Sequence, residues 1–172
     1  MFKATLLLPF VGLLFVAGCA VSQAPAPTVA SVEPMTIVPT IYVSRHMRKG
    51  EGDDPPLSAQ GSAEAERLAA LLSDKSIKAI FVTPTRRSRE TAAPLAAATG
   101  AAVETYDPRD NAALARRVAA IPGSILIVGH SNTVPEIVAA IGGTPPAPMS
   151  EEDFGRLFAV ERANGKTVES RV

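Results

Sequence analysis

Short apolar runs alternate with longer segments of helical periodicity along most of this 172-residue chain. The runs that predict β-strands cover residues 40–44, 79–83, 102–106, 124–128, 156–161 and 166–170. In the intervening segments apolar residues recur three or four positions apart, which is the spacing of a buried helix face. These residues are Ala65, Leu68, Ala69 and Leu72; Ala92, Leu95 and Ala96; Leu114, Val118 and Ile121; and Val134, Ile137, Val138 and Ile141. The alternation predicts an α/β fold: a three-layer sandwich whose mainly parallel central sheet has helices on both faces.

Turn and cap residues separate these predicted elements. Asn164-Gly165 lies between the last two runs and favours a hairpin turn, so we expect a C-terminal antiparallel hairpin. Ser58 and Asn132 are the expected N-caps of the first and last helices. Gly142-Gly143 is expected to end the last helix.

The two histidines of the chain each follow an apolar run directly. His46 comes after residues 41–45, and His130 comes after residues 125–129. In a mainly parallel sheet the carboxyl ends of the strands share one edge, where ligands bind. The sequence therefore predicts that both imidazoles lie at one edge of the sheet.

Basic residues are concentrated in two windows that follow predicted strands. Residues 45–49 and 86–89 hold six of the 17 Lys and Arg: Arg45, Arg48, Lys49, Arg86, Arg87 and Arg89. The second window also opens a predicted helix, whose first amides and dipole favour an anion. Because guanidinium groups fork onto phosphate oxygens, this arrangement indicates a site for a dianionic phosphate.

The first residues of the chain have the features of an export signal. Lys3 precedes an apolar stretch of about a dozen residues, too short to span a membrane, and Val16-Ala17-Gly18-Cys19 resembles a bacterial lipobox. We therefore expect a lipoprotein signal peptide over residues 1–18 and lipidation of Cys19, the only cysteine. Ala20 follows Cys19 in place of the aspartate that resembles an inner-membrane retention signal. The expected location is the cell envelope, lipid-anchored in the outer membrane and facing the periplasm.

The rest of the chain divides into a tether and one domain. Residues 19–36 are rich in Ala and Pro and are expected to be an extended tether, and residues 37–172 have the size of one domain. Without residues 1–18 the chain loses Lys3 alone among its charges, which leaves 16 basic and 17 acidic residues. This near-neutral balance argues against nucleic acid as a partner.

Four short motifs follow one another between residues 37 and 162. They are Arg45-His46 after a strand, Pro56-Leu57-Ser58-x-x-Gly61 opening a helix, Thr83-Pro84-x-x-Arg87-x-x-x-Thr91-Ala92, and Gly129-His130-Ser131-Asn132-Thr133. In this order and spacing they resemble the histidine phosphatase superfamily, which includes small phosphatases, phosphohistidine phosphatases and the cofactor-dependent phosphoglycerate mutases.

This resemblance implies a role for each matching residue. His46 would be the nucleophile that carries a covalent phosphoryl group, oriented through its other ring nitrogen by a backbone carbonyl. Arg45, Arg87 and His130 would bind the phosphoryl oxygens and stabilise their charge. No metal and no cofactor is expected. The expected activity is the hydrolysis of phosphomonoesters or phosphohistidine, with a phosphorylated small molecule or phosphoprotein as the substrate.

The chain departs from the family pattern at three points. Met47 stands where a Gly or Ala is usual, so the loop after the nucleophile must accommodate a larger side chain. Arg48 replaces a common Glu. The general acid that protonates the leaving group is not part of a motif; Asp107 is the first candidate and Glu104 the second, although Asp107 also suits a turn residue that caps the next helix.

Three other functions compete with the phosphatase. Gly129-His130-Ser131 is similar to a hydrolase nucleophile elbow at Ser131, but that fold needs a histidine later in the chain, and none follows. A zinc site of His46, His130 and Asp53 or Asp54 would leave the clustered arginines unexplained. The third alternative is an envelope lipoprotein that binds phosphate with weak or no catalysis.

Overall fold

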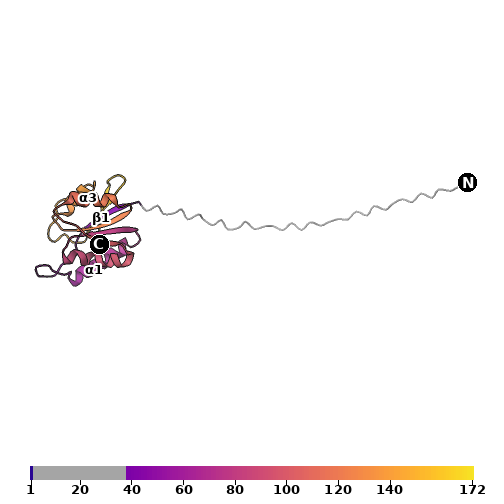
Figure 1. Cartoon of the computed structure of the whole chain (residues 1–172). Helices are drawn as coiled ribbons and strands as arrows, with labels where there is room; N and C mark the ends of the chain where they lie inside the picture. The colour runs from indigo at the N-terminus through magenta and orange to yellow at the C-terminus, as the bar shows by residue number, and fades with distance from the viewer. Residues whose placement is uncertain (2–37) are drawn as a thin grey trace. The chain divides into compact units, whose positions relative to one another are not determined.

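The computed structural model describes Met1 and residues 38–172. The predicted signal peptide, Cys19 and the tether lie outside the described residues. In the described part of the chain no helix is long and apolar enough to span a membrane. Figure 1 shows the whole chain.

Ten elements form the domain, and strands alternate with helices until the last two strands. They are β1 (Thr40–Arg45), α1 (Ala59–Leu72), β2 (Ile77–Val82), α2 (Arg86–Thr99), β3 (Ala102–Thr105), α3 (Asn111–Ala120), β4 (Ser124–Gly129), α4 (Val134–Ala140), β5 (Arg156–Glu161) and β6 (Thr167–Arg171). The sheet order is β3-β2-β4-β1-β5-β6. The pairs β3-β2, β2-β4 and β4-β1 are parallel, whereas β5 runs antiparallel to β1 and to β6. The predicted fold class and hairpin are confirmed.

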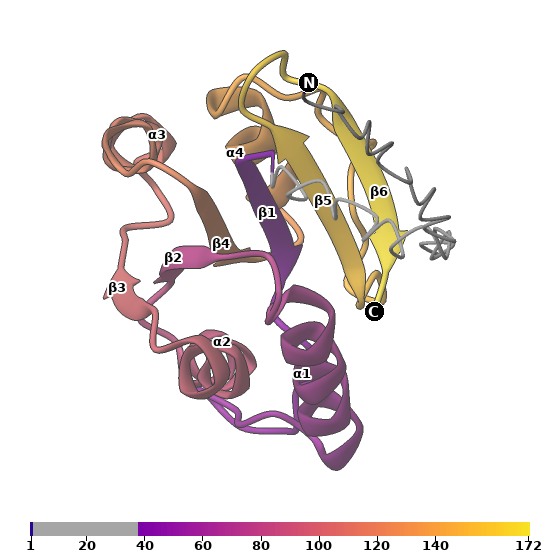
Figure 2. The same cartoon turned by 90° about the vertical axis from the view of Figure 1, so that its right-hand side faces the viewer.

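The sheet separates two apolar cores, and the inner strands β1, β2, β4 and β5 contribute to both by alternation. In β4, Ile125 and Ile127 belong to one core cluster, and Leu126 and Val128 belong to the other. Helices α1 and α2 cover one face, while α3 and α4 cover the opposite face (Figure 2). A strand covered on both faces has no polar side, which explains why β4 is apolar at almost every position.

The helix ends agree with the predicted caps except at α4. The Ser58 hydroxyl accepts a hydrogen bond from the Gly61 amide at 3.1 Å, as expected for the N-cap of α1. The prediction of Asn132 as the N-cap of α4 is wrong, because Thr133 occupies that position. The Thr133 hydroxyl accepts from the His130 amide at 3.0 Å, so the turn after β4 extends one residue further before the helix begins. Gly142, with φ +85°, follows the end of α4 as predicted.

The register of β1 and β4 sets the position of both histidines. Arg45 pairs with Gly129 at the end of the parallel ladder, and the His46 amide donates to the Gly129 carbonyl at 3.0 Å. Each histidine is thus the residue that follows a paired strand end. The sequence prediction that both lie at one sheet edge is confirmed.

Candidate active site

The two imidazoles face each other at the carboxyl ends of β1 and β4. The ring centroids of His46 and His130 are 5.3 Å apart, in an edge-to-face arrangement with an interplanar angle of 67°. The Phe154 ring lies on another side of His46, with a centroid distance of 6.0 Å. The two histidines therefore share one small site.

His46 is held as a neutral imidazole with one nitrogen available. Its Nδ1 lies 2.8 Å from the carbonyl oxygen of Met47, and because a carbonyl only accepts, Nδ1 is the protonated nitrogen. The lone pair is then on Nε2. Burial is the largest of the causes that lower the pKa of His46 to about 3. Arg45, His130 and Arg87 make smaller contributions in the same direction. A side chain only 2% exposed thus remains uncharged at neutral pH.

Met47 fits the loop because its side chain points away from the site. It is fully buried in the core cluster between the sheet and helices α1 and α2. Its amide donates to the Thr91 hydroxyl at 3.0 Å, and that hydroxyl donates to the Arg87 carbonyl at 2.8 Å. Met47 is also not among the described residues with positive φ, so no glycine is needed there. The larger residue is accommodated without obstructing His46.

Arg45 is buried beside His46 and retains one unused donor. Its Nη1 donates to the carbonyls of Ser150 and Glu151 at 3.1 and 2.6 Å, and its Nη2 donates to the Glu151 carboxylate at 3.0 Å. The guanidinium carbon lies 4.0 Å from the centroid of the Phe154 ring. Within the described residues, Nε of Arg45 is buried and has no hydrogen-bond partner. Such a donor is unfavourable unless a ligand or water accepts from it.

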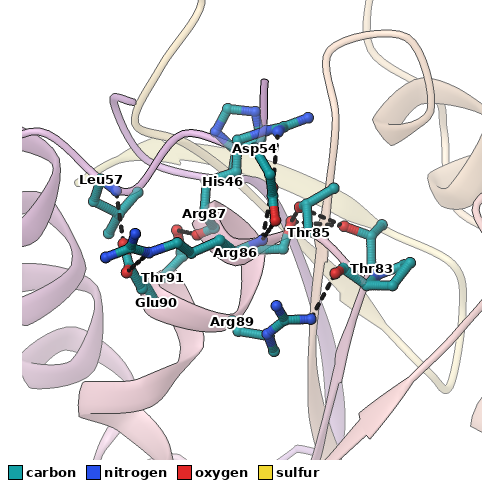
Figure 3. Close-up of polar contacts among 12 residues, drawn as sticks. His46, Asp54, Leu57, Thr83, Thr85, Arg86, Arg87, Arg89, Glu90 and Thr91 are labelled. Carbon is teal, nitrogen blue, oxygen red and sulfur yellow. Dashed lines mark hydrogen bonds and ion pairs between the residues drawn. The ribbon is translucent and has the colours of Figure 1, made fainter. Parts of the chain in front are cut away.

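Arg87 contributes a second charge from the first turn of α2. Its Nη1 lies 3.7 Å from Asp54, whose carboxylate also accepts from the Arg86 amide at 3.0 Å (Figure 3). Its Nε, like that of Arg45, is buried without a partner in the described part of the chain. Burial, with smaller contributions from the charges of Arg87 and Arg45, lowers the pKa of His130 to about 4. The site therefore combines two neutral imidazoles with two guanidinium groups.

A family sequence model matches the first part of the domain. The sequence model of the histidine phosphatase superfamily (branch 1) matches residues 41–109, which include Arg45, His46 and Arg87. The match covers 69 of the 172 residues of the chain. The match ends before His130, so the place of the second histidine in the site comes from the β1-β4 register.

Solved structures of phosphatases have the same fold as this domain. The structure of the protein histidine phosphatase SixA complexed with tungstate is 19% identical, covers 76% of this chain and 94% of its own, and gives a TM-score of 0.58. That of the mycobacterial glucosyl-3-phosphoglycerate phosphatase Rv2419c is 14% identical, covers 77% and 97%, and gives 0.61. At these identities the likeness shows the fold alone.

Two uncharacterized proteins of Mycobacterium tuberculosis are similar over a shorter stretch. Rv0525 of strain ATCC 25618 / H37Rv and MT0547 of strain CDC 1551 / Oshkosh are each 50% identical over 52 residues, which is 30% of this chain. The matched stretch spans about a quarter of the length of these curated relatives, 25% in each case.

The second sequence motif, Pro56-Leu57-Ser58-x-x-Gly61, holds the loop that follows His46. The Ser58 amide and hydroxyl both donate to the Arg48 carbonyl, at 2.9 and 3.3 Å. A Cβ on Gly61 would lie 1.9 Å from that same carbonyl oxygen, so only glycine fits. The Arg48 side chain turns to Glu64, with Nε 2.8 Å from its carboxylate. The N-terminus of α1 thus clamps the backbone two residues after His46.

The two candidate acids both pair with arginines elsewhere. Asp107 forms a bidentate pair with Arg109 at 3.0 and 2.9 Å, and these hydrogen bonds lower the pKa of Asp107 to about 2. Glu104 on β3 lies 2.6 Å from Arg117. Both carboxylates are engaged in ion pairs with arginine, so this geometry gives neither residue support as the general acid.

Two alternatives lose support from the same geometry. The Ser131 hydroxyl donates to Glu151 at 2.5 Å, and no histidine follows Ser131 that could activate it as a nucleophile. Among Met1 and residues 38–172, no three His, Cys, Asp or Glu side chains are grouped to hold a metal ion. Asp54 instead binds the first amide of α2.

Sequence reasoning did not identify two residues of this site, Glu151 and Phe154. They precede β5 and come together with Arg45 through the antiparallel pairing of β1 and β5. No motif surrounds them in the sequence, so only the strand order could have indicated their position.

Proposed function

We propose that this domain is a metal-independent phosphatase that hydrolyses phosphomonoesters or phosphohistidine through a covalent phosphohistidine on His46. The observation that carries the proposal is the neutral His46, with Nδ1 bound to a carbonyl, beside two arginines whose buried Nε donors have no partner among residues 38–172. A tetrahedral phosphoryl group is an acceptor of the right charge for such donors.

In the first step, His46 Nε2 attacks phosphorus while the bond to the leaving oxygen or nitrogen breaks. The phosphoryl oxygens accept from Arg45, Arg87 and His130, which stabilise the charge spread over them. The Nδ1 proton stays on the imidazole, hydrogen-bonded to the Met47 carbonyl, so the phosphorylated ring remains oriented. The leaving group takes up a proton as it departs.

In the second step, water attacks phosphorus, the phosphorus–Nε2 bond breaks, and His46 returns to its neutral form. The water loses one proton, and the products are inorganic phosphate and the free enzyme. Asp107 and Glu104 remain the two sequence candidates for proton transfer, but both are paired with arginine. A phosphohistidine substrate has a better leaving group, so this arrangement favours phosphohistidine over alkyl phosphates.

The similar structures support the reaction class and leave the substrate open. One is named a protein histidine phosphatase and another a glucosyl-3-phosphoglycerate phosphatase, so substrates of very different size occur on this fold. For this chain we propose a phosphoprotein or a small phosphorylated molecule as the substrate.

A panel of aryl phosphates, phosphoamino acids and sugar phosphates tests the proposal. We expect vanadate-sensitive hydrolysis that falls about a thousandfold or more in His46→Ala, and also in His130→Ala and Arg87→Ala. Trapped phosphoenzyme should be acid-labile and base-stable. An active His46→Ala protein would exclude the covalent mechanism.

A phosphate-binding protein without turnover is the second candidate. The observation that favours it is the burial of His46, which is 2% exposed, and of Arg45, which is 1% exposed. If phosphate raises the thermal stability of the full chain while every substrate of the panel remains intact, binding is the function.

We also propose that the domain acts in the cell envelope as a lipoprotein anchored through Cys19. Membrane fractionation of the full chain tests this location. The lipobox-like residues 16–19 and the Ala/Pro-rich stretch that follows are the support for this location.

A further inference from the structure

The segment before β5 contacts the candidate site at several points. Residues 150–154, which we call the strap, contribute two backbone carbonyls, the Glu151 carboxylate and the Phe154 ring to the surroundings of Arg45. The strap belongs to neither the family match nor the sequence motifs. Its contacts with a phosphate-binding arginine therefore need an explanation.

The strap binds the NH₂ groups of the Arg45 guanidinium and leaves Nε without a partner in the described residues. A guanidinium presents a terminal edge, formed by its two NH₂ groups, and a side edge, formed by Nε and one NH₂ group. The terminal edge of Arg45 donates to Ser150 and Glu151, whereas the buried Nε on the side edge has no partner in the described residues. The side edge is therefore the one that an anion can approach.

Glu151 also connects Arg45 to the turn that carries the second histidine. One carboxylate oxygen accepts from Arg45 at 3.0 Å, and the other accepts from the Ser131 hydroxyl at 2.5 Å. Ser131 directly follows His130. The Ser131 hydrogen bond and the charge of Arg45 lower the pKa of Glu151, so the carboxylate is ionised at neutral pH. A single carboxylate thus links the ends of β1 and β4.

We infer that Glu151 is a positioning residue: it holds the terminal edge of Arg45 so that the Nε edge faces the phosphoryl group, and it fixes the His130 turn through Ser131. This inference rests on the proposed function and deepens it. Arg45 is rigidly buried, at 1% exposure, while the Glu151 side chain is 68% exposed. Replacing Glu151 therefore removes the link with little disturbance of the core.

The test measures phosphate and vanadate affinity of the full-length chain by calorimetry, together with kcat and KM. We expect Glu151→Ala to weaken phosphate binding and raise KM about three- to tenfold, as for loss of a partly exposed, charge-assisted contact. Glu151→Asp should recover part of the affinity. Ser131→Ala should show a smaller loss, because one of the two links remains.

Glu152→Ala is the matched control. Glu152 is an exposed neighbour on the same strap with the same charge, and its side chain makes no hydrogen bond in the described structure. Equal losses in Glu152→Ala and Glu151→Ala would overturn the inference in favour of a general effect of charge. Tighter phosphate binding by Glu151→Ala would also overturn it, since the carboxylate would then be a competitor of phosphate.

Binding and turnover separate this inference from the proposed function. If the unsubstituted chain binds phosphate without hydrolysing any substrate, the catalytic proposal fails while the affinity comparison still decides the role of Glu151. If the unsubstituted chain hydrolyses substrates and all variants bind phosphate equally, the proposed phosphatase function stands and the positioning role of Glu151 is refuted. Absence of phosphate binding in the unsubstituted chain would overturn both.

Discussion

At the scale of single residues, His46 obtains its chemistry from burial and from one carbonyl. The hydrogen bond from Nδ1 to Met47 fixes the tautomer, and burial keeps the ring neutral. The kind of orienting partner, a backbone carbonyl, could be predicted from the family resemblance, and the role of His46 as nucleophile stays a prediction. The identity of the carbonyl could not, since it depends on how the loop turns back on itself.

The protonation of His46 gives a prediction for pH. Its pKa is about 3 in the folded chain, against an ordinary value of 6.5. Above about pH 6.5 both folded and unfolded chains are neutral at this position; between 6.5 and 3 only the unfolded chain takes up the proton. We therefore expect the free energy of unfolding to fall as pH decreases through this window, and to fall less steeply in His46→Ala.

Imidazole carbon shifts followed by NMR provide the direct measurement. Both His46 and His130 should remain neutral down to about pH 5, because the pKa values are about 3 and about 4. A titration of either ring near pH 6.5 would contradict the burial described for the site.

Met47 gives a second prediction at this scale. Because the side chain is fully buried in the core between the sheet, α1 and α2, we expect Met47→Ala to lower the free energy of unfolding by about 2–5 kcal/mol. Met47→Leu conserves volume and should lower it by less than about 1.5 kcal/mol. Denaturant unfolding measures both; a stable Met47→Ala protein would mean that the side chain does not fill this core.

At the scale of elements, the strand order and helix ends bring the motifs together. The apolar runs predicted β1, β2 and β4 because these strands are buried, and the turn residues between the last two runs predicted the β5-β6 hairpin. Asn132 was misassigned as a cap because a single polar residue before a helix cannot indicate how far the preceding turn extends. Glu151 and Phe154 escaped prediction for a related reason: their contacts arise from the pairing of β5 with β1, far apart in sequence.

The contact between α1 and the nucleophile loop leads to a third prediction. Gly61→Ala would place a Cβ 1.9 Å from the Arg48 carbonyl oxygen, so either the helix or the loop must move. We expect a loss of about 1–3 kcal/mol in the free energy of unfolding and a lower kcat, because the displaced loop carries the orientation of His46. Gly50→Ala is the control: its Cβ would lie 3.7 Å from the Pro56 carbonyl oxygen, an ordinary contact. Unchanged kcat in Gly61→Ala would show that this clamp is not needed for catalysis.

At the scale of the whole molecule, a single catalytic-type domain follows a segment that predicts export and lipidation. We expect the full chain to label with palmitate in a bacterial host and to fractionate with membranes, and Cys19→Ala to lose the label. In the variant, the domain should keep the proposed phosphatase activity, because residues 38–172 contain all of the candidate site residues. Membrane recovery and labelling of Cys19→Ala equal to those of the unsubstituted chain would refute lipidation at this position.

Met47 connects the candidate active site directly to the packing of the core. Its carbonyl oxygen accepts the hydrogen bond from Nδ1 of His46, while its side chain is packed among α1, α2 and the sheet. Any loosening of that core would therefore reach, within a single residue, the ring that we propose as the nucleophile. We therefore expect the protonation state of His46 to change when the packing of the α1–α2 layer changes.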